Sequence, residues 1–167
     1  MNTKSLVKRA EDGAISILTI VPSRNNIQQF WCMIDQFNVS KIVLLKKQKE
    51  KISDFFPTTD EPIKTPAHIV ALMAAESMED DIFKFTLKLW NIAKRTEQHV
   101  NIYKIISWEV NKNHPTIASL SKLLTAITDT QTRFVCFIGS KQIGFPICGC
   151  LGVCFDVVNA IKDDKPF

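Results

Sequence analysis

Residues 15–45 read ISILTIVPSRNNIQQFWCMIDQFNVSKIVLL, and this stretch decides the fold. Ile15–Val21 is a short apolar run that ends at Pro22, which is typical of a buried strand. Lys41–Leu45 is a second such run, rich in β-branched residues. Between the two runs, the polar segment 23–26 supplies residues that begin helices well. The stretch therefore predicts a strand, a helix and a second strand.

The helix expected after residue 26 has a clear apolar face. Its large apolar side chains recur at helical spacing, which predicts one buried stripe. These residues are Ile27, Phe30, Trp31, Ile34 and Phe37.

The middle of the chain predicts antiparallel strands. Residues 53–66 contain three prolines and are expected to be irregular. His68–Met73 is expected to form a strand. Phe83–Ile92 alternates between apolar and other residues, and Val100–Ile106 is its expected hairpin partner across the polar turn 93–98. The alternation places on one face Phe83, Phe85, Leu87 and Leu89.

The last third of the chain predicts a helix, a strand and a helix. Pro115 begins the first helix, Phe134–Ile138 forms the strand, and Pro146 begins the final helix. The residues of the first helix that are expected to face the core are Ile117, Leu120, Leu124 and Ile127. The order of elements indicates an α/β fold with a mixed sheet flanked by helices. Residues 15–167 are expected to be one domain, after a poorly structured lead over residues 1–14.

Composition excludes several classes of function. The chain has 167 residues and a net charge of +4, and its basic cluster 46–51 lacks interleaved aromatic residues, so we expect no nucleic-acid partner. The first residues lack the apolar core of a signal peptide. The longest uncharged apolar run, Ile143–Phe155, is too short to span a bilayer. We therefore expect a cytoplasmic chain whose own sequence does not insert into a membrane.

The cysteines and histidines do not predict a metal or cofactor site. Cys148, Cys150 and Cys154 lie in an apolar segment with no histidine at metal-ligand spacing, so we expect small buried residues in a reducing compartment. His68, His99 and His114 are scattered along the chain and suggest no metal site. We expect no cofactor and no metal.

The loop after Phe134–Ile138 has the outline of a phosphate-binding site. Gly139 and Gly144 stand in a G-x-x-x-x-G frame between a strand and a helix. A nucleotide-binding loop of this kind continues with lysine and serine or threonine, whereas Phe145 and Pro146 follow here. The loop therefore disfavours a nucleotide site, and the same strand-loop-helix frame serves a second phosphate chemistry.

The same frame, together with residues 15–45, resembles the receptor-type tyrosine phosphatases, in particular their second, membrane-distal domains of the gamma/zeta group. Residues 30–34 (FWCMI) are similar to the family's F-W-x-M-I. Residues 55–63 (FFPTTDEPI) are similar to its tyrosine-tryptophan-proline stretch and acidic-proline turn, and residues 105–108 (IISW) to the approach to its acid loop. The resemblance implies a partial tyrosine-phosphatase-like fold cut at both ends.

In that family a cysteine thiolate at the end of the strand attacks phosphorus and an arginine grips the phosphate, in the motif H-C-x-x-x-x-x-R. The preferred register places Phe137 at the histidine, Ile138 at the cysteine and Gly144 at the arginine. A second register, six residues later, places Gly144 at the cysteine and Cys150 at the arginine. Neither supplies a cysteine–arginine pair. The degenerate phosphate-loop positions are Phe137, Ile138, Gly139, Ser140, Lys141, Gln142, Ile143 and Gly144.

Two neighbouring features complete the comparison. Cys136 is expected on the same strand face as Ile138, buried behind the loop. The acid loop of the family has a W-P-D motif, and the corresponding positions here are degenerate. They are Trp108, Glu109 and Val110.

The resemblance implies a catalytically inactive module of phosphotyrosine signalling that binds protein partners, including an active phosphatase domain. Backbone donors and Lys141 leave weak anion binding open, without the bidentate grip of an arginine. One alternative is an active phosphatase that uses Cys148 or Cys150. Another is a fragment without independent function, which would self-associate through exposed apolar faces.

Overall fold

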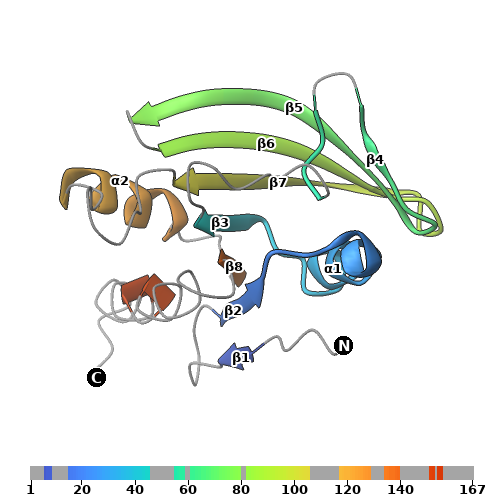
Figure 1. The fold of residues 1–167 in the computed structure, drawn as a ribbon, viewed down its shortest axis with the longest axis horizontal. Coiled ribbons are helices and arrows are strands. Elements are labelled where there is room, and N and C mark those ends of the chain that lie inside the picture. The colour runs from blue at the N-terminus through green and yellow to red at the C-terminus, as the bar shows by residue number, and fades with distance from the viewer. Residues whose placement is uncertain are drawn as a thin grey trace.

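The computed structural model describes residues 6–8, 15–45, 55–58, 61–79, 82–105, 117–128, 134–139, 151–152 and 154–155. In these residues a sheet carries helices on both faces (Figure 1), which confirms the α/β class. The elements are β1 (Leu6–Lys8), β2 (Ile15–Ile20), the 3-10 turn Arg24–Asn26, α1 (Ile27–Gln36), β3 (Lys41–Leu45), β4 (Ile63–Lys64), β5 (His68–Glu79), β6 (Ile82–Asn91), β7 (Thr96–Ile105), α2 (Ile117–Ile127) and β8 (Phe134–Gly139). Further helical residues are Leu151, Gly152, Cys154 and Phe155.

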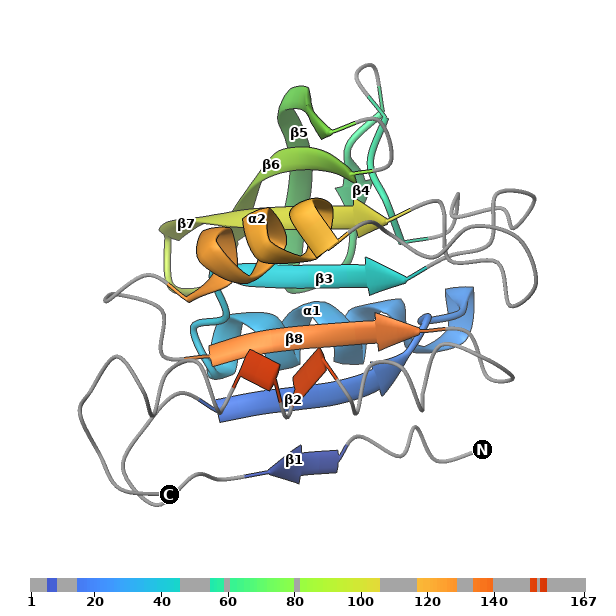
Figure 2. The same ribbon diagram turned by 90° about the vertical axis from the view of Figure 1, so that its left-hand side faces the viewer.

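The described strands form one mixed sheet in the order β1-β2-β8-β3-β7-β6-β5-β4. The four central strands β2, β8, β3 and β7 are parallel. β8 comes last in the chain yet lies between β2 and β3 (Figure 2). The strands of the unit β2–α1–β3 are therefore not neighbours in the sheet, because β8 lies between them.

The helices cover opposite faces of these central strands, as Figures 1 and 2 show. α1 connects β2 to β3, and α2 lies between β7 and β8 in the chain. Parallel neighbours need long crossover connections of this kind, because a short turn cannot return the chain to the start of the sheet. Leu151 and Phe155 belong to the same core cluster as α2, so the last described helical residues lie on the α2 face.

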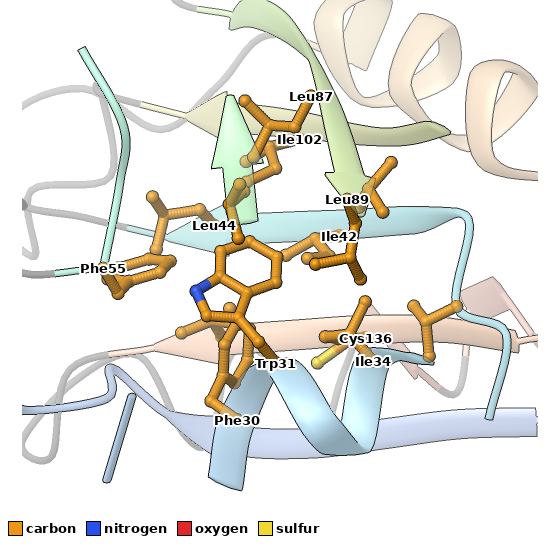
Figure 3. Close-up of a cluster of buried hydrophobic side chains, with 14 of the residues drawn as sticks. Phe30, Trp31, Ile34, Ile42, Leu44, Phe55, Leu87, Leu89, Ile102 and Cys136 are labelled. Atoms are coloured by element: carbon orange, nitrogen blue, oxygen red, sulfur yellow. The ribbon is translucent and has the colours of Figure 1, made fainter. Parts of the chain in front are cut away.

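The core on the α1 face surrounds Trp31 (Figure 3). Phe30, Trp31 and Ile34 are buried, and the outer members of the predicted stripe, Ile27 and Phe37, are partly buried against the same cluster. The ring of Phe30 meets that of Trp31 edge-on at a centroid distance of 5.0 Å. The strands supply alternate residues to this cluster: Ile17, Ile42, Leu44, Leu87, Leu89, Val100, Ile102, Cys136 and Ile138.

The core on the α2 face corrects the predicted stripe of α2. Leu123 and Ile127 are fully buried, whereas Leu120 and Leu124 are only partly buried. The prediction is confirmed for Ile127 and for Leu120 and Leu124, which pack against the cluster, but it omitted Leu123. Three leucines make a broad apolar stripe, and packing on the sheet buries Leu123 most deeply. The side chain of Ile117 lies outside the described part.

The antiparallel side of the sheet is more regular than predicted. β5 extends to Glu79, well past the expected end at Met73, and has bulges near Leu72 and Ser77. The proline-rich segment contributes the two-residue strand β4, so it is not irregular throughout. The β6–β7 hairpin is confirmed, with Arg95 in its turn at φ 54°. Within the N-terminal lead, β1 pairs with β2.

Candidate functional site

The carboxyl ends of the parallel strands meet in one row. Gly139 of β8 is paired with Ile20 of β2 and with Leu45 of β3, and Leu45 is paired with Ile105 of β7. The Val21 N–H donates to the Gly139 carbonyl at 3.2 Å, which extends the pairing past the end of β2. In the sequence, the phosphate-loop positions 140–144 come after β8 and the acid-loop positions come after β7, and both of these strands end in this row.

The chain leaves two neighbouring strands of this row toward opposite faces. After β2 it enters α1, which packs on one core cluster, and after β8 it reaches Leu151 and Phe155, which pack in the other. In open α/β sheets, ligands bind outside the carboxyl ends of strands where the connections diverge in this way. The end of β8 is therefore the topological position for a ligand.

The first three predicted loop positions lie inside β8. Ile138 is fully buried in the cluster beneath α1, and Phe137 is fully buried on the other face, where its ring lies 6.2 Å from that of Phe155. Gly139 is the last residue of the strand and is also buried. The predicted positions Ser140, Lys141, Gln142, Ile143 and Gly144, and also Trp108, Glu109 and Val110, lie outside the described residues.

Cys136 lies on the same face of β8 as Ile138, as the alternation of the strand predicts. It is 0% exposed and packs in the cluster around Trp31 (Figure 3). A thiol in this position does not reach the edge of the sheet, and apolar surroundings disfavour its ionised, nucleophilic form. The row itself consists of Ile20, Gly139, Leu45 and Ile105, none of which is a nucleophile or a cation.

The geometry agrees with a comparison to protein families. Residues 4–151 match the family described as Protein-tyrosine phosphatase. The chain belongs to the protein-tyrosine phosphatase family. A search of curated proteins finds no match.

Solved structures of the phosphatase family share the fold. The catalytic domain of human protein tyrosine phosphatase non-receptor type 18 is 18% identical with a TM-score of 0.81, and the match covers 98% of this chain and 60% of that one. The same phosphatase in complex with HER2 phosphopeptides gives a TM-score of 0.80 at 18% identity, covering 96% of this chain and 57% of that one. This chain thus spans about three fifths of the length of those phosphatase chains.

A polar cluster of this phosphatase-family chain lies near the β6–β7 turn, at the opposite end of these strands from Ile105. β6 has ten residues, so its two ends are about 30 Å apart. Asp35 of α1 accepts hydrogen bonds from the Asn91 amide and from the Lys94 ammonium, each at 2.9 Å to Oδ2. The same oxygen lies 3.5 Å from Nε2 of His68, whose side chain is 2% exposed.

This cluster controls the ionisation of Asp35. Burial opposes ionisation, but hydrogen bonds from Lys94, Asn91 and His68 outweigh it and hold the pKa of the Asp35 carboxyl below its usual value. On the other side of the imidazole, Sγ of Cys32 lies 4.0 Å from Nδ1. The sequence prediction treated His68 only as a scattered histidine. The available signal was the spacing of Cys32 and Asp35, which places both on one side of a helix.

None of the described helices is both long and apolar enough to cross a membrane. No group of three or more histidine, cysteine, aspartate or glutamate side chains in the described part could hold a metal ion.

Proposed function

We propose that this chain is a catalytically inactive tyrosine-phosphatase-like domain that acts in phosphotyrosine signalling by binding protein. The observation that carries the proposal is the end of β8. Family chemistry places a thiolate at the end of this strand, and here the strand ends on Gly139 after a buried Ile138. A glycine and an isoleucine side chain cannot attack phosphorus.

The position of the strand end favours a register one residue later than the preferred sequence register. The motif C-x-x-x-x-x-R then begins at Gly139 and ends at Phe145, in place of Ile138 and Gly144. The later register, with Gly144 and Cys150, again lacks the pair. All three registers lack both the thiol and the guanidinium, and without the guanidinium the bidentate grip on phosphate is lost.

The test is turnover of para-nitrophenyl phosphate and of a phosphotyrosine peptide by the purified chain. We expect no release of phosphate above the rate in buffer. The contrary outcome is turnover that disappears in Cys148→Ser or Cys150→Ser. The control is Cys136→Ser, because Cys136 is 0% exposed and is not the proposed nucleophile of the active alternative.

The finer proposal is that the chain is the second, membrane-distal phosphatase-like domain of a receptor of the gamma/zeta group, on the cytoplasmic side of a single-pass membrane protein. Its proposed partner is an active phosphatase domain, which it docks against and regulates. Isothermal titration of the chain with the active domain of such a receptor tests this, and heat of binding at micromolar concentration is expected. Absence of heat, with both proteins folded by circular dichroism, would count against this partner.

A second candidate is a fragment without independent function, which is favoured by its coverage of only 57–60% of the related phosphatase chains. Neighbouring segments would then normally cover apolar surface. The large apolar side chains exposed in the described part are those of Met73 and Ile92, at 57% and 44%. Light scattering with calorimetry separates the candidates, because a fragment of this kind would self-associate and unfold without cooperativity.

A further inference from the structure

Cys32, His68 and Asp35 form a chain of contacts from sulfur to imidazole to carboxylate. Cys32 and Asp35 are one turn apart on α1, and His68 is the first residue of β5. Sγ of Cys32 lies 4.0 Å from Nδ1 of His68, and Nε2 of His68 lies 3.5 Å from Oδ2 of Asp35. A nucleophile next to a base that is itself oriented by a third group is the general arrangement for activating a thiol.

The surroundings hold this arrangement in place. His68 is 2% exposed, and its backbone N–H and carbonyl are both bonded to Thr65. Asp35 is fixed by Lys94 from the β6–β7 turn and by Asn91 from β6. The polar side chains that face the imidazole are therefore Cys32, Asp35 and Asn91, with Lys94 behind the carboxylate. Cys32 itself is half-buried.

The position of the imidazole proton follows from its neighbours. Two groups compete for a hydrogen bond at Nε2. The Asp35 carboxylate would accept a hydrogen bond from a protonated Nε2, whereas the Asn91 amide, 3.3 Å away, would donate one to an unprotonated Nε2. The carboxylate is ionised, and hydrogen bonds to ionised acceptors are about twice as strong as neutral ones. The proton is therefore assigned to Nε2, which leaves Nδ1 free to accept the proton of the Cys32 thiol.

We propose that Cys32 is a reactive thiol and a site of oxidation by hydrogen peroxide, with His68 as its base and Asp35 as the positioning residue for His68. This site is independent of the proposed function, because it lies at the opposite ends of the strands from Gly139 and involves no phosphate.

The reaction needs no group beyond the peroxide. The thiol proton passes to Nδ1 of His68, and the sulfur attacks one peroxide oxygen. An S–O bond forms, the O–O bond breaks, and the departing hydroxide takes the proton back from the imidazole and leaves as water. Sulfur loses two electrons and the peroxide gains them, so the products are a sulfenic acid and water.

Two other described cysteines provide internal comparisons. Cys136 is 0% exposed and should be unreactive in the folded chain. Cys154 is exposed, so the expectation that it is buried was wrong for this cysteine. Within the described part no hydrogen bond joins it to a histidine. If exposure alone decided reactivity, Cys154 would react faster than the half-buried Cys32. The contact with His68 predicts the reverse order.

The experiment measures both rates in the same sample of the whole chain. The protein is treated with hydrogen peroxide at pH 7, sulfenic acids are trapped with dimedone, and peptides are quantified by mass spectrometry. We expect Cys32 to react about a hundredfold faster than Cys154, the low end of the range for base assistance.

Variants test the roles of the other two residues. His68→Gln should remove the advantage of Cys32 over Cys154, and His99→Gln, at an exposed histidine, is the matched control. Asp35→Asn should lower the rate of Cys32 relative to that of Cys154, and Asp35→Glu, which keeps a carboxylate, should retain more of that rate. Dimedone labelling of the buried Cys136 shows that a variant has unfolded. If a variant unfolds, the ratio of the Cys32 rate to the Cys154 rate in the wild-type chain decides the proposal. A wild-type Cys32 that reacts no faster than Cys154 overturns the proposal, as does an unchanged ratio in a folded His68→Gln variant.

Discussion

The carboxylate of Asp35 should contribute strongly to stability, and replacing it by asparagine isolates that contribution. Asp35 is 15% exposed and accepts two hydrogen bonds at 2.9 Å, from Asn91 and Lys94. A hydrogen bond to a charged group contributes about 1.5–3 kcal/mol. Lys94 is 60% exposed, so solvent screens its bond to well under that range.

The sum for Asp35→Asn is therefore a loss of about 2 kcal/mol in the free energy of unfolding at pH 7. For a domain of this size, that loss lowers the melting temperature by about 4–8 °C. The matched control is Glu97→Gln, which removes the partner of Lys88 from a pair whose side chains are 37% and 45% exposed. The control should change the melting temperature little, because exposed ion pairs contribute little.

The pH dependence provides the sharper test. The pKa of Asp35 is lowered from 3.8 in the folded chain, so the unfolded chain binds the proton more readily. Stability from this group is therefore complete above the unfolded-state value and is lost as the pH falls through the folded-state value. The difference between wild type and Asp35→Asn should be constant from pH 7 to pH 5 and should shrink below pH 3.8.

The assay is urea unfolding followed by tryptophan fluorescence, at a series of pH values with constant ionic strength. The midpoint and slope give the free energy of unfolding for each variant. A difference below about 0.5 kcal/mol at pH 7 would refute the reasoning, because this is the size of an ordinary surface substitution. A difference that grows as the pH falls below 3.8 would refute the sign of the linkage.

Three further predictions use the same unfolding assay. Leu123→Ala should cost about 2–5 kcal/mol, and Leu124→Ala clearly less, because Leu123 is fully buried and Leu124 is not; equal losses would contradict the observed orientation of α2. Lys41→Met should cost about 1–3 kcal/mol, because the buried Lys41 ammonium donates to the Ala126 carbonyl at 2.6 Å near the end of α2; an unchanged midpoint would mean that this bond contributes nothing. Arg95→Gly should stabilise by about 1 kcal/mol, since Arg95 has φ 54°; a loss would show that its side chain outweighs the backbone strain.

Local sequence was sufficient for the central elements of this chain. Local signals predicted two strands from the apolar runs at 15–21 and 41–45, and a helix from the spacing of the stripe on α1. The structure has a strand or helix in each place. The β6–β7 hairpin was predictable for the same reason, since its strands are neighbours in the chain. Failures occurred where a choice depended on a partner: the buried line of α2, the length of β5 and the strand β4.

The end of β8 shows the same limit at the candidate site. An apolar run predicted the strand, but its last residue was placed at Ile138. Pairing with Ile20 and Leu45 extends it to Gly139, because a strand between two neighbours continues as far as their hydrogen bonds reach. One residue of strand changes which side chain stands at the sheet edge, although no register supplies a thiol there.

By itself, the sequence determined the α/β class and the identity and order of most elements, because these depend on neighbouring residues. Only the tertiary structure decided that β8 lies between β2 and β3. It also brings His68, the first residue of β5, next to Cys32 and Asp35 of α1. Contacts between residues more than thirty positions apart have no periodicity to reveal them. They form when packing of α1 against the sheet brings distant backbone segments together.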